Sequence, residues 1–117
     1  MQVQTNTDKN IPGGDRLSQY VKSSLDSKLS RFSEHLTRVE AHLSDESGQK
    51  PGSANKKCVM EARPRGMQPL AVTHSADTLD HAISGAVEKL ERLLDSTFGQ
   101  LSSHKGRTRL ADSDLPG

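Results

Sequence analysis

The segment DTLDHAISGAVEKLERLLDSTFGQL, residues 77–101, carries the clearest periodic pattern in the chain. Its apolar residues recur at spacings that place them along one stripe of an α-helix. They are Ile83, Ala86, Val87, Leu90, Leu94, Phe98 and Leu101. Asp77 or Thr78 can cap the start of this helix, because both side chains can accept hydrogen bonds from its free amide groups. A helix with one apolar stripe must cover an apolar surface, which the rest of the chain has to supply.

Four other segments alternate between apolar and polar residues, a pattern that predicts strands with one buried side. They cover residues 1–6, 38–45, 57–63 and 70–75. Pro69 has no backbone N–H to donate, so the last of these strands should lie at an edge of the sheet.

A second helix is predicted between the first two strands, over residues 16–35. Its apolar stripe comprises Leu17, Val21, Leu25, Leu29 and Phe32, and Asp15 can cap its start. Residues 46–55 form a polar loop rich in Gly, Pro and Ser.

The order of elements is therefore strand, helix, three strands, helix. It predicts an α+β fold, β-α-β-β-β-α, with a four-stranded sheet and two helices packed on one face. The other face of the sheet should meet solvent. A length of 117 residues fits one domain. We assign residues 1–101 to it and expect residues 102–117, which have little apolar content, to be a flexible C-terminal tail.

Composition narrows the class of protein. The net charge is +1, so any nucleic-acid binding must depend on where the charges lie. The single cysteine fits a reducing compartment, and the N-terminus lacks the features of a signal peptide. No apolar run approaches the roughly 20 residues that cross a bilayer. We expect a soluble cytoplasmic protein that does not bind membranes.

Catalytic chemistry finds no support in the residue pattern. The five histidines fall on different elements without ligand-like spacing, and no phosphate-binding or nucleophile motif is present. Cys58 has the apolar phase of its strand, which favours a buried structural thiol. Asp77 and Asp80 are acids at a helix start, where the helix dipole favours them anyway. We expect no enzyme activity, metal, cofactor or small-molecule substrate.

Basic residues concentrate in two places. Residues 15–38 hold five basic and three acidic side chains, a balance of +2, and residues 56–66 hold four and one, a balance of +3. The second group includes Lys57, Arg63 and Arg65, which could contact phosphates. A solvated surface of mixed charge explains the same pattern equally well, so charge alone does not decide.

Several short stretches, in their order and spacing over residues 1–98, make the chain resemble a known family. This is the bacterial family of ribosome hibernation-promoting factors and ribosome-associated inhibitors, also called sigma-54 modulation proteins, in its short form. The matching pieces are Met1-Gln2-Val3, Leu17 with Tyr20-Val21, Lys28-Leu29 with Arg31-Phe32, Arg38-Val39, Ala82-Ile83, and Glu88-Lys89-Leu90-Glu91-Arg92 with Leu94.

The resemblance implies a fold related to double-stranded-RNA-binding domains and a specific partner. It implies binding to 16S ribosomal RNA of the small (30S) ribosomal subunit, in the mRNA and tRNA channel, which inhibits translation under stress or in stationary phase. The residues it assigns to RNA contact are Lys22, Lys28, Arg31, Arg38, Lys89 and Arg92. The chain has no room for the dimerisation domain of long-form members, so we expect a monomer off the ribosome.

Two departures from the family pattern keep an alternative open. The family's last helix ends in a dense Lys/His cluster, whereas residues 95–100 read DSTFGQ and basic residues return only from His104. Asp80 stands where the family tends to have an aromatic residue. The alternative is a divergent member that kept the fold and binds a protein partner or another RNA.

Overall fold

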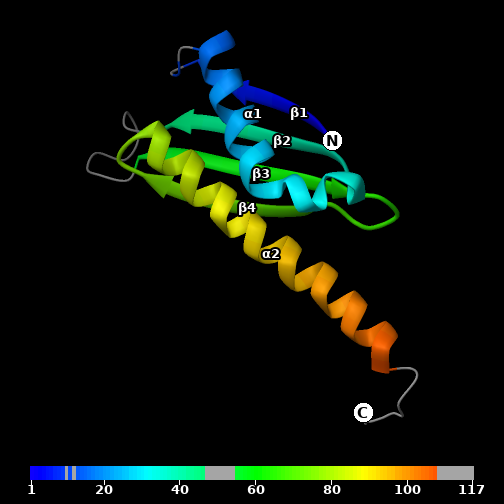
Figure 1. The fold of residues 1–117 in the computed structure, drawn as a ribbon. Helices are drawn as coiled ribbons and strands as arrows, with labels where there is room; N and C mark the ends of the chain where they lie inside the picture. The colour runs from blue at the N-terminus through cyan, green and yellow to red at the C-terminus, as the bar shows by residue number, and fades with distance from the viewer. Residues whose placement is uncertain (10, 12, 47–54, 108–117) are drawn as a thin grey trace.

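The computed structural model describes residues 1–9, 11, 13–46 and 55–107, the last eight of these by backbone alone. Four strands, two α-helices and one 3₁₀ helix follow one another in the predicted order (Figure 1). Their bounds are β1 Gln2–Thr7, α1 Asp15–Leu29, η1 Ser30–His35, β2 Leu36–Asp45, β3 Lys56–Pro64, β4 Leu70–Ala76 and α2 Leu79–Arg107.

The strands form one sheet in the order β1-β2-β3-β4. β1 runs parallel to β2, and the other two pairs are antiparallel. Both helices lie on the same face of the sheet, with α1 toward β1 and α2 over β3 and β4 (Figure 1). The predicted α+β fold and the edge position of β4 are therefore confirmed. Among the described residues, no helix covers the opposite face of the sheet, called here the open face.

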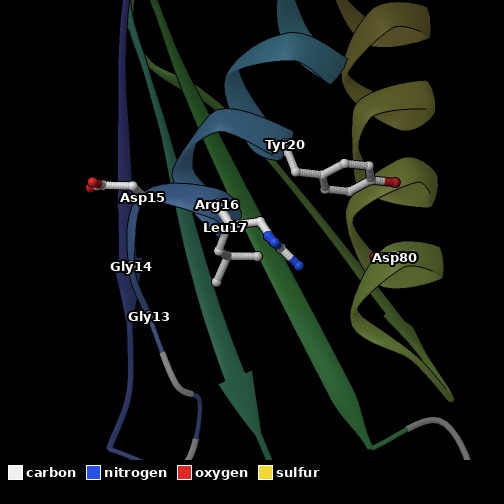
Figure 2. A pocket seen from close by; sticks show the side chains of 7 residues that line it. All are labelled: Gly13, Gly14, Asp15, Arg16, Leu17, Tyr20 and Asp80. Carbon is white, nitrogen blue, oxygen red and sulfur yellow. The ribbon is translucent and has the colours of Figure 1, made fainter.

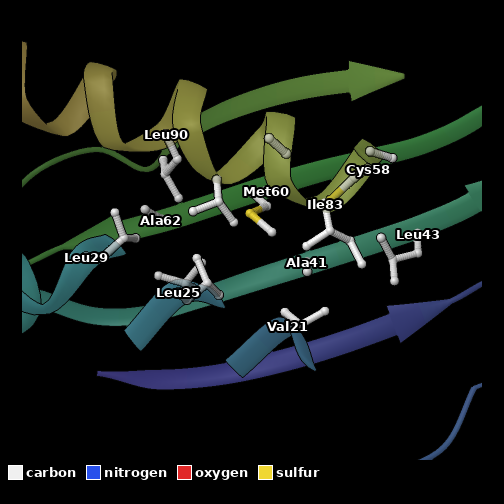
Figure 3. Close-up of a cluster of buried hydrophobic side chains, with 14 of the residues drawn as sticks. Val21, Leu25, Leu29, Ala41, Leu43, Cys58, Met60, Ala62, Ile83 and Leu90 are labelled. Atoms are coloured by element: carbon white, nitrogen blue, oxygen red, sulfur yellow. The ribbon is translucent and has the colours of Figure 1, made fainter. Parts of the chain in front are cut away.

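The core lies between the sheet and the two helices (Figure 3). Helix residues such as Leu25 and Leu90 meet strand residues such as Ala41 and Met60, and all four are fully buried. The alternating strand pattern arises because every second strand residue points into this layer. Burial of apolar surface here is the main stabilising contribution, at roughly 25 cal/mol per Å².

The helix predicted over residues 16–35 is in fact two elements. The α-helical part ends at Leu29, and η1 follows with Phe32 buried. The spacing of three between Leu29 and Phe32 suits a 3₁₀ turn as well as an α-helix, so the sequence pattern could not separate them. The tighter turn leads the chain directly into β2.

Of the predicted helix caps, the one for α2 is confirmed and the one for α1 is not. Thr78 Oγ1 accepts a hydrogen bond of 3.2 Å from the His81 N–H, so it is the cap of α2. The prediction that Asp15 caps α1 was wrong, because Gly14 occupies that position and Asp15 lies in the first turn. Gly14 has φ 136°, a backbone conformation that favours glycine.

The last helix is longer than predicted. α2 continues to Arg107, so residues 102–107 of the predicted tail are helical, and Figure 1 shows its end extending past the sheet. Phe98 of α2 packs against η1, with its ring centre 5.7 Å from the ring centre of Phe32. The side chain of Leu101 and all of residues 108–117 lie outside the described residues.

One contact brings α2 and β4 unusually close together. The His74 ring of β4 lies directly against the α2 backbone at Gly85. A Cβ atom added at Gly85 would lie 2.1 Å from His74 Cδ2 and 2.6 Å from its Cγ. Glycine is therefore required here by the approach of the ring, although it is a poor helix former.

We expect Gly85→Ala to lower the free energy of unfolding by about 1–3 kcal/mol, because the ring must move out of a packed position. In a His74→Ala background the same substitution should instead stabilise the protein by roughly 0.5–1 kcal/mol, the ordinary helix preference for alanine. Urea unfolding of the four proteins measures both effects. Equal effects of Gly85→Ala in the two backgrounds would contradict the proposed contact.

Candidate RNA-binding surface

The nine basic residues predicted to contact RNA lie on more than one side of the molecule. Lys22 and Lys28 are on α1, Arg31 on η1, Arg38 on β2, Lys57 and Arg63 on β3, Arg65 in the turn after β3, and Lys89 and Arg92 on α2. The strand residues among them alternate with buried core residues, so Arg38, Lys57 and Arg63 face the open side of the sheet. The helix residues lie on the other side. The structure therefore offers two candidate surfaces rather than one patch.

The basic side chains of the open face form ion pairs with acidic residues. Glu40, with only 13% of its side chain exposed, lies 3.0 Å from Arg38 Nε, 3.7 Å from Arg63 Nη2 and 3.3 Å from His42 Nε2. Glu61 adds a second partner for Arg63 at 3.3 Å. These carboxylates offset most of the positive charge that the arginines carry. Lys57 is likewise 3.8 Å from a carboxylate oxygen of Glu46 at the other end of the sheet.

Arg31 and Arg65 connect η1 to its neighbours. The Arg31 guanidinium lies 3.4 Å from Asp95 and 3.8 Å from Glu91 of α2, and 4.6 Å from the centre of the Phe32 ring. Arg65 Nε donates to the backbone oxygen of Glu34 at 3.0 Å. Both side chains have a structural role here, and the charge of Arg31 faces two carboxylates.

Of the four predicted contact residues that have no acidic partner among the described residues, three lie on the helix side and the fourth is Arg65. Lys22 pairs with Asp26 at 2.9 Å, one turn further along α1. Within the described part of the chain, Lys28 and Arg92 have no ion-pair partner, and Lys89 Nζ donates to the uncharged carbonyl of Thr73 at 2.9 Å. These three cations, together with Glu88 between them, are called here the helix surface. It runs from α1 across α2 toward β4, since Lys28 and Glu88 line one groove while Glu88, Lys89 and Arg92 line the next.

A separate groove lies where the starts of α1 and α2 diverge (Figure 2). Tyr20, 38% exposed, extends from α1 toward α2 and lines this groove of about 590 Å³. Its charged lining residues are Arg16, Asp15 and Asp80, a balance of −1. Phosphate groups would be repelled by such a lining, so this groove does not extend the helix surface.

Groups suited to catalysis do not converge in the described residues. No set of three or more His, Cys, Asp or Glu side chains there is arranged to hold a metal ion. Cys58 is buried on the core face of β3, and this burial raises the pKa of its thiol to about 12. The thiolate is the nucleophilic form, so burial and the raised pKa both disfavour Cys58 as a nucleophile. Over the same part of the chain, no helix combines the length and apolar character needed to span a membrane.

Residues 5–108 match the family described as sigma 54 modulation protein / S30EA ribosomal protein. The chain therefore belongs to this family, which confirms the resemblance drawn from the sequence. Among curated proteins, none matches the chain.

The fold is shared by solved structures, of which two are described here. The N-terminal domain of Thermus thermophilus Protein Y has a TM-score of 0.67 and 20% identity, covering 83% of this chain and 99% of that chain. A ribosomal subunit interface protein from Coxiella burnetii has a TM-score of 0.59 and 14% identity, covering 92% of this chain and 100% of that chain. At these identities the likeness concerns the fold alone.

We expect Glu40→Gln to lower the free energy of unfolding by about 1–2 kcal/mol. The change removes the charge that lies between two guanidinium groups and leaves them facing each other. Glu88→Gln is a matched control, because Glu88 is exposed and should change stability by less than about 0.5 kcal/mol. Urea unfolding measures both, and equal effects would show that the Glu40 contacts contribute nothing.

A second prediction concerns Cys58. Between about pH 9 and 12 the unfolded chain releases the thiol proton while the folded protein keeps it, so stability must fall as pH rises. The Cys58 contribution to this slope approaches about 1.4 kcal/mol per pH unit. Comparison with Cys58→Ala isolates it from lysine and tyrosine titration. Parallel stability curves for the two proteins would show that Cys58 ionises normally.

Proposed function

We propose that this protein binds the small ribosomal subunit and inhibits translation as a hibernation factor under stress or in stationary phase. It would occupy the mRNA and tRNA channel, contact 16S ribosomal RNA, and be a monomer off the ribosome. Family membership over residues 5–108 supports association with the ribosome. The observation that carries the RNA contact is the helix surface, where three cations remain free of carboxylate partners within the described residues.

The helix surface is the better candidate for RNA because its three cations form no ion pairs with carboxylates within the described residues. Phosphate binding by Arg38 or Arg63 would compete with Glu40 and Glu61, which already lie within 4 Å of them. Binding by Lys28 or Arg92 breaks no ion pair. Each phosphate contact releases counterions, so such binding should weaken with salt.

The sequence has further basic residues at the end of α2. The family's last helix ends in a Lys/His cluster, where residues 95–100 of this chain read DSTFGQ. Here the backbone of α2 continues to Arg107, so Lys105 and Arg107 belong to the helix instead of a tail.

Two double variants test which face binds. Lys28→Gln/Arg92→Gln removes two charges from the helix side, and Lys57→Gln/Arg63→Gln removes two from the open face. We expect the first to weaken binding to purified 30S subunits by about tenfold or more, at 1–3 kcal/mol for the pair, and to reduce the salt slope by about 1 per contact. The second should have a much smaller effect. Co-sedimentation over a range of salt concentrations measures both.

The result that would overturn the proposal is a wild-type protein that remains at the top of a sucrose gradient at low salt. A larger effect of the open-face variant would instead move the RNA contact to the sheet.

One observation favours a second candidate function, a divergent member that binds a protein partner or another RNA. Five of the nine predicted contact residues already have acidic partners, namely Lys22, Arg31, Arg38, Lys57 and Arg63. Capture of partners with and without ribonuclease treatment distinguishes the two. Captured proteins that are retained after ribonuclease treatment and include no ribosomal components would favour this candidate.

A further inference from the structure

A hollow of about 310 Å³ lies on the outer side of α2, where this helix passes over the edge strand β4. Four of its lining residues are basic and one is acidic. The lining comprises His74, His81, Ser84, Gly85, Glu88, Lys89 and Arg92. Neither histidine was predicted to be a site residue, because in the sequence they fall on different elements.

The fold brings the histidines to this hollow by two routes. His81, Gly85, Glu88 and Arg92 follow spacings of four, three and four, so they share one face of α2. His74 comes from β4 and reaches the same place because Gly85 has no side chain to exclude its ring. Glycine at position 85 is therefore what allows the His74 ring to line the hollow.

The charges around the hollow favour an anion. Lys89 is held at the rim by its 2.9 Å hydrogen bond to the Thr73 carbonyl, and Arg92 has no carboxylate partner among the described residues. With Glu88 as the one acid and both imidazoles neutral, the lining carries a net charge of +1, two cations less one anion. Protonation of both imidazoles would raise it to +3. On the sheet side, the partner of His74 on β3 is Cys58, which stays neutral.

We propose that this hollow is a pH-dependent phosphate-binding site, in which His74 and His81 join Lys89 and Arg92 in contacting the RNA backbone. The inference rests on the proposed function for the source of the phosphate. Imidazole is the side chain that changes charge between pH 5 and 8, and a neighbouring phosphate favours its protonated form. Binding therefore takes up protons, and RNA binding strengthens as pH falls.

The site would make the protein responsive to acidification. In the proposed site, the contacts of Lys89 and Arg92 are joined by those of the two histidines as the pH falls. A cell whose internal pH drops would thus hold this protein more tightly on its RNA target without any change in protein amount.

The experiment measures affinity for purified 30S subunits from about pH 8 to about pH 6 at constant ionic strength. We expect wild-type affinity to rise about tenfold over this range, as uptake of roughly half a proton per complex requires. His74→Gln/His81→Gln should match wild type near pH 8 and lose most of the increase. His42→Gln, on the open face, is the matched control and should keep the increase in affinity. Any change in affinity caused by titration of the ribosome itself appears in this control as well.

A double variant with the full wild-type increase would overturn the site. Because His74 packs on Gly85, the exposed single variant His81→Gln is measured as well, and it should lose part of the increase while melting at the wild-type temperature.

A second arm separates this inference from the proposed function. Tripolyphosphate is titrated into the isolated protein near pH 6, and the imidazole NMR resonances are followed. Saturable shifts of His74 and His81, without shifts of His42, are expected even if no ribosome binding is found. Absence of these shifts overturns the site, whereas absence of 30S binding at every pH overturns the proposed function.

Discussion

The structure depends on the burial of one face of the sheet under two helices. The apolar stripes of α1 and α2 cover this face, and residues such as Leu25, Leu90 and Met60 are fully buried between the layers. Because both helices are used on one side, the other side of the sheet must be stable in water by itself. This division into a covered and an open face determines where each charged residue can act.

The open face shows how a polar sheet surface is stabilised. The partly buried carboxylate of Glu40 contacts Arg38, Arg63 and His42, because the cross-strand register places these side chains next to one another. Such a network stabilises the pairing of the strands, but its carboxylates offset the positive charge that RNA binding would require. On the helix side, Lys28 and Arg92 have no carboxylate partner within the part of the chain that the structure describes. The two faces therefore differ in the balance of acids more than in the number of basic residues.

Much of the architecture could be predicted from periodicity, because a buried layer imposes its repeat directly on the chain. The strand alternation of Val39, Ala41 and Leu43 and the helical stripe through Ile83 and Leu94 both mark residues that the structure buries. Local choices were less predictable. The 3₁₀ turn at Phe32 preserves the apolar spacing of a longer helix, and the extension of α2 to Arg107 carries no apolar signal of its own. The relation to double-stranded-RNA-binding domains stays a prediction.

By itself, the sequence determined the order of elements, the side of each that faces the core, and the family, since all three are written in local spacing and in short matching stretches. Only the tertiary structure decided which charges are free. Arg31 meets Asp95 across two helices, Arg63 meets Glu40 across two strands, and His74 meets Gly85 between β4 and α2. Each partner is distant in sequence, and the electrostatic interaction depends on separation in space, which no local pattern encodes.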